Sequence, residues 1–150
     1  MKKTIPDLTR RYPRSPHIKL GPFVHLPRMI DKARAKGADL LGEYLYPCPL
    51  DQCLLEFLEI GGQKFLDLTK EYDDEEILSW LRENRRNHAQ EEIEKWNDDF
   101  LNRKPQGEDE MKRFKKIQEQ IAPNKKDIST WIELLDIDEG RSLHPGKGQG

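Results

Sequence analysis

Cys48 is the side chain best suited to covalent chemistry, because a cysteine thiolate is a strong nucleophile. It directly precedes Pro49 at the expected start of a helix, where the positive end of the helix dipole stabilises negative charge on sulfur. The opposing interpretation makes Cys48 a small buried hydrophobic residue, since the spacing offers it no partner base. We favour the second interpretation and keep Cys48 as a candidate.

Arginine side chains are the other group suited to a functional role. Residues 1–36 hold ten lysines and arginines against two acidic residues, and the rest of the chain is net acidic. Guanidinium groups match the geometry of carboxylate and phosphate, so Arg14 and Arg34 are candidates to line a pocket for an anion. The alternative is that Arg28 and Lys32 lie on a solvated face with weak ion pairs, in which Asp31 is an i,i+3 partner of Arg28.

The basic start of the chain has two further interpretations. It is typical of an arm that binds nucleic acid, but it also fits a segment that lies across the acidic remainder of its own chain. Trp80, Trp96 and Trp131 each fall on an apolar helical stripe, so we assign them to the core and not to base stacking. We favour the intramolecular interpretation and do not expect a nucleic-acid partner.

Several classes of site have no support in the sequence. The four histidines lack the spacing of a zinc site, and no phosphate-binding loop or dinucleotide fingerprint is present. Cys48 and Cys53 are too few for a disulfide scaffold, which fits a reducing compartment. No apolar run approaches the length of a membrane span. We expect a cytoplasmic protein with no metal, cofactor or membrane partner.

The chain divides into three parts by composition. Four prolines punctuate residues 1–22 and predict an extended basic arm, whose apolar residues should pack on the domain. Residues 23–139 should form one helical domain, with a thin core because 35% of residues are hydrophobic and 36% are charged. Residues 140–150 are rich in glycine and are predicted to be disordered.

Apolar residues at helical spacing predict an all-α fold, an irregular bundle of six to seven helices. The first helix ends at Gly37 and either starts at Pro27 or starts near Pro22 and bends at Pro27. Residues 43–46 fit a brief extended piece. Asp73 is the expected N-cap of a helix that contains Trp80, and the acidic residues 74–76 place negative charge at the positive end of its dipole. Asn124 with Asp127 should open the last helix.

Short segments along the chain resemble a bacterial family catalogued as domain of unknown function 5069. They are DLT at 7–9, PRSP at 13–16, LPRMIDKARA at 26–35, GEY at 42–44, CPLD at 48–51, EIEKWN at 92–97, IAPN at 121–124, DISTW at 127–131 and LLD at 134–136. The resemblance implies a compact helical domain in the bacterial cytoplasm. It implies no activity, substrate, cofactor or catalytic residue.

Two hypotheses for function follow. The first is a binding or regulatory module that holds a small anionic ligand or a protein partner through the arm and the first helix. The second is an enzyme of unknown reaction, with arginine clamps beside the thiol. We favour the first. The candidate ligand-binding residues are Arg14, Arg28, Asp31, Arg34, Tyr46, Cys48 and Asp51.

Overall fold

The structure is a computed structural model of the chain and describes residues 4–141. Seven helices and one hairpin with two residues in each strand lie in this range, which confirms the all-α prediction. Contacts divide the chain into two compact units, residues up to Glu94 and residues from Lys95 onward. Of the predicted disordered tail, only residues 140 and 141 are described, and Arg141 there pairs with Asp136.

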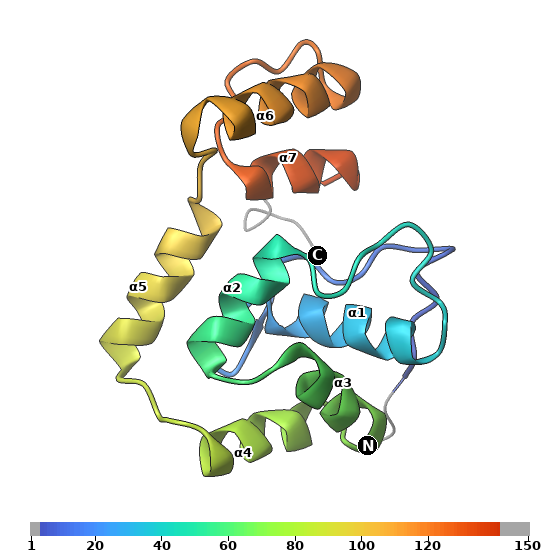
Figure 1. The fold of residues 1–150 in the computed structure, drawn as a ribbon, viewed down its shortest axis with the longest axis vertical. Coiled ribbons are helices and arrows are strands. Elements are labelled where there is room, and N and C mark those ends of the chain that lie inside the picture. Colours follow the sequence, from blue (N-terminus) through green and yellow to red (C-terminus); the bar gives the residue numbers. More distant parts are fainter. Residues whose placement is uncertain (1–3, 142–150) are drawn as a thin grey trace. The chain divides into compact units, whose positions relative to one another are not determined.

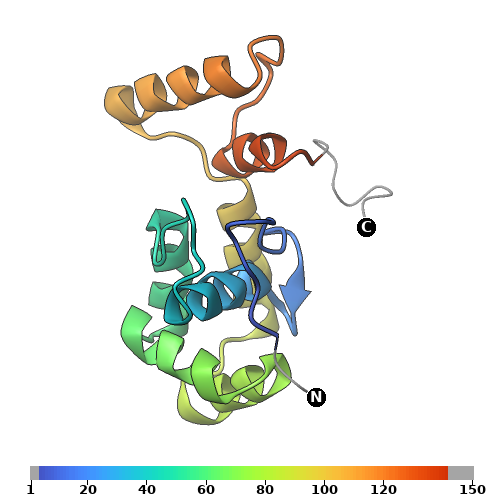
Figure 2. The same ribbon diagram turned by 90° about the vertical axis from the view of Figure 1, so that its right-hand side faces the viewer.

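The first unit is built around one central helix. It contains α1 (Leu26–Gly37), α2 (Pro49–Leu58), α3 (Gly62–Glu71) and α4 (Asp74–Asn84). The hairpin pairs β1 (Lys19–Leu20) with β2 (Phe23–Val24) in antiparallel register. Helix α1 packs on α3 and on β1, and α4 packs on α3 and on β1 (Figures 1 and 2).

Helix α1 is buried on every side. Each residue from Leu26 to Ala35 is buried, including four charged ones, Arg28, Asp31, Lys32 and Arg34. The expectation that Arg28 and Lys32 occupy a solvated face is therefore wrong. They are covered because the arm and the 44–51 connection lie over the polar side of α1 and supply partners for its charges.

The start of α1 distinguishes between the two predicted alternatives. The helix begins at Leu26 with Pro27 in its first turn, and no bent helix starts near Pro22. Phe23 shares the helical spacing of Leu26 and Ile30 but lies in β2 instead of the helix. His25 precedes the helix with φ of 70°, a left-handed conformation that few residues other than glycine adopt. The brief extended piece expected at 43–46 is not a strand, and the only strands among residues 4–141 are those of the hairpin.

Helices α2 to α4 follow their sequence signals closely. The Asp73 side chain accepts a hydrogen bond from the Glu76 backbone N–H, and the Glu76 carboxylate accepts one from the Asp73 backbone N–H, which forms the predicted capping box of α4. Cys48 and Asp51 form the same pair of contacts at α2.

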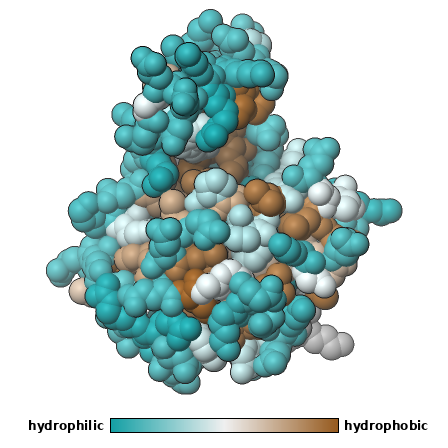
Figure 3. Space-filling model, in the orientation of Figure 1, coloured by the Kyte–Doolittle hydropathy of each residue, from teal (hydrophilic) through white to brown (hydrophobic). Residues whose placement is uncertain are grey.

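The second unit has its own small core. Helix α5 (Gln90–Leu101) begins in the first unit and continues into the second, which also contains α6 (Gly107–Ile121) and α7 (Trp131–Asp138). Helix α6 packs on α7, and Phe114, Ala122, Ile128 and Leu134 are buried together. Charged and polar side chains cover most of the visible face of the molecule, as the composition predicts (Figure 3).

The start of α7 differs from the prediction. Thr130 is the N-cap, not Asn124 or Asp127, because its hydroxyl accepts from the Glu133 backbone at 3.1 Å while Glu133 accepts from the Thr130 backbone at 3.0 Å. Ile128 precedes the helix and is buried in the core of the second unit.

Thr130→Ala should lower the free energy of unfolding of the second unit by about 1 kcal/mol, because the helix loses its capping hydroxyl. Urea titration followed by the amide signals of α7 measures this loss. Ser129→Ala is the matched control, since that side chain is exposed and should change stability by less than about 0.5 kcal/mol. An equal effect of both substitutions would remove the cap from the explanation.

Candidate functional site

The described part of the arm lies against the rest of the first unit. Leu8 is buried and its backbone N–H donates to the carbonyl of Leu40 at 2.9 Å. Pro13, Ser15 and Pro16 are also buried. The arm therefore reaches α1 with Arg14 fixed in position.

Arg14 and Arg34 enter one network of ion pairs. The Arg14 guanidinium donates to both carboxylate oxygens of Asp31, each at 3.0 Å, and to Asp74 Oδ2 at 2.8 Å. Arg34 donates to Asp74 Oδ1 at 2.9 Å and to the carbonyl of Tyr72 at 3.0 Å. The arm, α1 and the first turn of α4 are thus joined through alternating charges.

Asp74 holds the two arginines together. Burial alone would raise the pKa of its carboxyl group, but hydrogen bonds from Arg14 and the charges of Arg14 and Arg34 place that pKa below its ordinary value. Its side chain keeps 27% of its exposure, whereas that of Arg34 keeps 5%. Asp74 is therefore ionised, and it is more accessible to solvent than Arg34.

A cavity of about 540 Å³ opens at this network. Its lining combines guanidinium groups, carboxylates and the ring of Tyr12. The residues are Thr4, Pro6, Arg11, Tyr12, Arg14, Asp31, Arg34, Asp73, Asp74 and Glu75. Both signs of charge therefore face the cavity, and two of its arginines already bind carboxylates of the protein.

A second polar cluster surrounds Asp51, whose side chain has no exposure. Its Oδ1 lies 2.8 Å from His25 Nε2, and its Oδ2 accepts from Lys32 Nζ at 2.8 Å and from the Cys48 backbone at 3.0 Å. Lys32 Nζ also donates to Cys48 Sγ at 3.2 Å. The cluster places an ammonium group between a buried carboxylate and the thiol.

The charges in this cluster follow from the pKa shifts. Burial of Asp51 opposes ionisation, but the hydrogen bond from His25 and the charge of Lys32 outweigh it and bring the pKa of Asp51 well below its ordinary value. Burial lowers the pKa of His25, although its contact with Asp51 acts in the opposite direction. His25 is therefore neutral near pH 7, with its proton on Nε2, because the carboxylate of Asp51 only accepts.

Tyr46 and Arg28 have structural contacts in the same region. The Tyr46 hydroxyl donates to the carbonyl of Gly62 at 2.8 Å, and burial raises the pKa of this hydroxyl. Arg28 donates to the carbonyl of Arg14 at 3.3 Å and lies over the ring of Tyr44, 5.7 Å from its centre. Arg28 therefore holds the arm and the connection against α1, and Tyr46 ties the connection to the start of α3.

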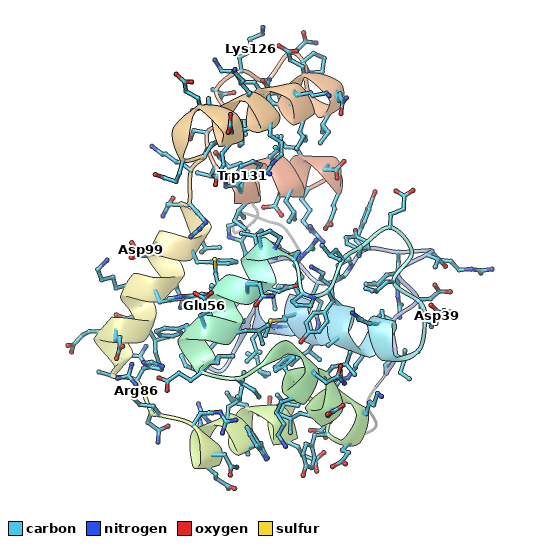
Figure 4. The ribbon with its side chains drawn as sticks, viewed as in Figure 1. Asp39, Glu56, Arg86, Asp99, Lys126 and Trp131 are labelled. Carbon is cyan, nitrogen blue, oxygen red and sulfur yellow. The ribbon has the colours of Figure 1, made fainter. Side chains whose placement is uncertain are left out.

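The seven candidate residues are divided between these contacts. Arg14, Asp31 and Arg34 share the cavity network, and Cys48 and Asp51 share the second cluster. No cavity described for residues 4–141 is lined by both Arg34 and Cys48. Figure 4 shows the side chains that crowd around α1.

Sequence reasoning missed three members of these clusters, His25, Lys32 and Asp74. His25 was assigned no role because it lacks a metal-site spacing, and Lys32 was assigned to solvent. Asp74 was explained as a charge at a helix start. The signal that would have marked them is their partner, and each partner lies far away in sequence.

Residues 4–141 contain neither a metal-binding cluster nor a membrane-spanning helix. No group of histidine, cysteine and acidic side chains there is arranged to hold a metal ion. None of the helices in that range combines the length and the apolar character needed to cross a bilayer.

Comparison with known proteins adds one finding. A family model described as Domain of unknown function (DUF5069) matches residues 10–141, a range that includes every helix and strand of both units. The match confirms the resemblance found in the sequence. No curated protein matches the chain.

Proposed function

The chain belongs to the family described as a domain of unknown function, DUF5069, and from this premise we propose that it is a binding module for a small anionic ligand. The ligand occupies the cavity between the arm, α1 and α4. We also propose a cytoplasmic setting, which the absence of a disulfide scaffold supports.

The main support for the proposal is the buried Nε of Arg34, which lacks a hydrogen-bond acceptor within residues 4–141. Its side chain is 5% exposed and lines the cavity, yet its Nε finds no acceptor among the residues that the structure describes. A buried donor without an acceptor costs about 1–3 kcal/mol. A carboxylate or phosphate in the cavity would satisfy it.

Asp74 sets how such a ligand binds. It already occupies both arginines and is their more exposed partner, so an entering anion competes with its carboxylate for Arg14 and Arg34. The acidic lining also favours a ligand that carries a positive group near Asp73 or Glu75. An amino-acid-like or phosphoamine-like molecule has this combination.

Two substitutions with opposite effects test the proposal. Arg34→Gln should weaken binding of the ligand by about 2 kcal/mol, because a charged hydrogen bond is lost. Asp74→Asn should raise the affinity for the ligand, because the carboxylate that competes with it loses its charge. The measurement is a thermal-shift screen of a metabolite library on both variants, followed by calorimetric titration of each hit.

Arg10→Gln is the matched control, because Arg10 lies in the same arm and its side chain is 86% exposed. Hits that stabilise all three variants and the parent chain equally would exclude the cavity as their site. Hits that Asp74→Asn weakens as strongly as Arg34→Gln does would contradict competition with Asp74.

A second candidate function is covalent chemistry at Cys48. The contact from Lys32 Nζ to Sγ at 3.2 Å favours it, because an ammonium group stabilises negative charge on sulfur. Cys48 also lies at the start of α2 and is partly exposed.

Cys53 provides an internal control for this candidate, since it lies in the same helix and is also partly exposed. Iodoacetamide at pH 7 should alkylate Cys48 at least tenfold faster than Cys53, as peptide mass spectrometry over a time course would show. Equal rates at the two cysteines would leave Cys48 with its capping role alone.

A further inference from the structure

We propose a second, independent binding site at the end of α4, which takes a small organic oxyanion, a carboxylate or phosphate ester with a short apolar body. A cavity of about 180 Å³ lies there, formed by the hairpin, α2, α4 and the start of α5. It belongs entirely to the first unit. Figure 4 labels Arg86, one of its residues, between α4 and α5.

The lining of this cavity carries positive charge without carboxylates. It contrasts with the larger cavity, where four acidic side chains face three arginines. The lining residues are Pro22, Phe23, Leu58, Leu81, Arg82, Arg85, Arg86, Asn87, His88, Gln90 and Ile93. The side-chain amides of Asn87 and Gln90 are further hydrogen-bond donors beside the three guanidinium groups.

Carboxylates outside the lining neutralise only part of this charge. Arg86 pairs with Glu59 at 3.2 Å and with Glu92 at 3.1 Å, and His88 Nδ1 lies 3.0 Å from the same Glu92. These contacts account for Arg86 and His88, so the remaining positive charge belongs to Arg82 and Arg85.

Arg85 is held in place by neutral groups. Its Nε donates to the carbonyl of Glu59 at 2.8 Å and its guanidinium lies 4.9 Å from the centre of the Trp80 ring. Within residues 4–141, no carboxylate pairs with Arg85 or with the Arg82 guanidinium. A positioned guanidinium, that of Arg85, and an exposed one, that of Arg82, therefore face one cavity, and neither pairs with a carboxylate of the described residues.

The other wall of the cavity is apolar and determines the class of ligand. Phe23, Leu58, Leu81 and Ile93 line it, and all four are buried. The volume suits a ligand of a few carbon atoms and not a nucleotide, since cofactor pockets are typically about 300–1,000 Å³. The apolar part would lie on this wall, with the oxyanion on Arg82 and Arg85.

NMR titration of the full chain with phenyl phosphate, at constant ionic strength, tests this site. Saturating shifts should be confined to residues 82–93 and to β2. Arg82→Gln should weaken the affinity at least tenfold. Arg10→Gln, which removes an exposed arginine of the same unit, should leave the affinity unchanged.

Titrations with inorganic phosphate and with phenol measure the separate contributions of the oxyanion and of the apolar ring. Inorganic phosphate should bind at least tenfold more weakly than phenyl phosphate, and phenol should cause no saturating shifts. Equal binding of the two phosphates would overturn the apolar part of the proposal. Shifts scattered over the surface, or an affinity that Arg82→Gln does not change, would overturn the site itself. Shifts at Arg14 and Arg34 instead would assign the probe to the larger cavity.

Discussion

Lys32→Met should lower the free energy of unfolding of the first unit by about 3–5 kcal/mol, because it leaves a buried carboxylate without its ammonium partner. Asp51 has no exposed side-chain surface and Lys32 keeps 4% of its exposure, so water cannot replace the lost contact. Methionine matches the length of the lysine stem, so packing changes little. Urea titration followed by the amide signals of α1 measures the loss.

Two further variants separate the ion pair from packing. Arg10→Met breaks a contact of 3.9 Å between exposed side chains and should cost less than about 0.5 kcal/mol. The double variant Lys32→Met with Asp51→Asn should recover part of the stability, since it removes the unpaired charge. A double variant no more stable than Lys32→Met alone would mean that lost packing, not charge, causes the effect.

Acidification from pH 7.5 to pH 5 should destabilise the first unit through His25. Its pKa is lowered by burial in the folded state, whereas in the unfolded chain it stays near 6.5. Between these values the unfolded chain binds a proton that the folded chain does not. The stability is therefore complete above pH 6.5 and falls as the pH drops below it.

The Asp51 carboxyl group contributes in a lower pH range. Its pKa in the folded state is below the ordinary value of 3.8, so its contribution is complete above about pH 4 and is lost at more acidic pH. The loss of stability expected between pH 7 and pH 5 is therefore caused by protonation of His25 and not of Asp51.

His25→Asn identifies the histidine responsible. Asparagine tolerates the left-handed backbone at this position and its amide can still donate to Asp51. Chemical denaturation at several pH values should show a flatter dependence between pH 7 and pH 5 for this variant. An unchanged dependence would show that His25 is not the group responsible.

Local signals in the sequence predicted most helices correctly. The capping box of α4 acts over a few residues, so its effect can be recognised without the rest of the fold. The start of α7 was missed because Asn124, Asp127 and Thr130 are all suitable N-cap residues within a short stretch, and Thr130 is the one that caps the helix.

The polar side of α1 could not be predicted, because its partners are distant in sequence. Arg14 and Asp31 are separated by 17 positions, and Arg14 and Asp74 by 60. A helical projection separates apolar from charged residues but does not show that other segments cover the charged face. The sequence therefore indicated that Arg14 and Arg34 lie together, and missed the carboxylate between them.

The charges of α1 also constrain when this unit can assemble during synthesis. Its cations are made first, within a stretch of 36 residues that holds only two acidic ones, whereas Asp51 and Asp74 are translated later. Until Asp74 has been translated, Arg34 has no carboxylate to accompany it into the interior, and burial of a lone charge is prohibitive. We therefore expect a nascent chain that stops before α4 to lack a stable substructure, and the first unit to fold only after its fourth helix has emerged.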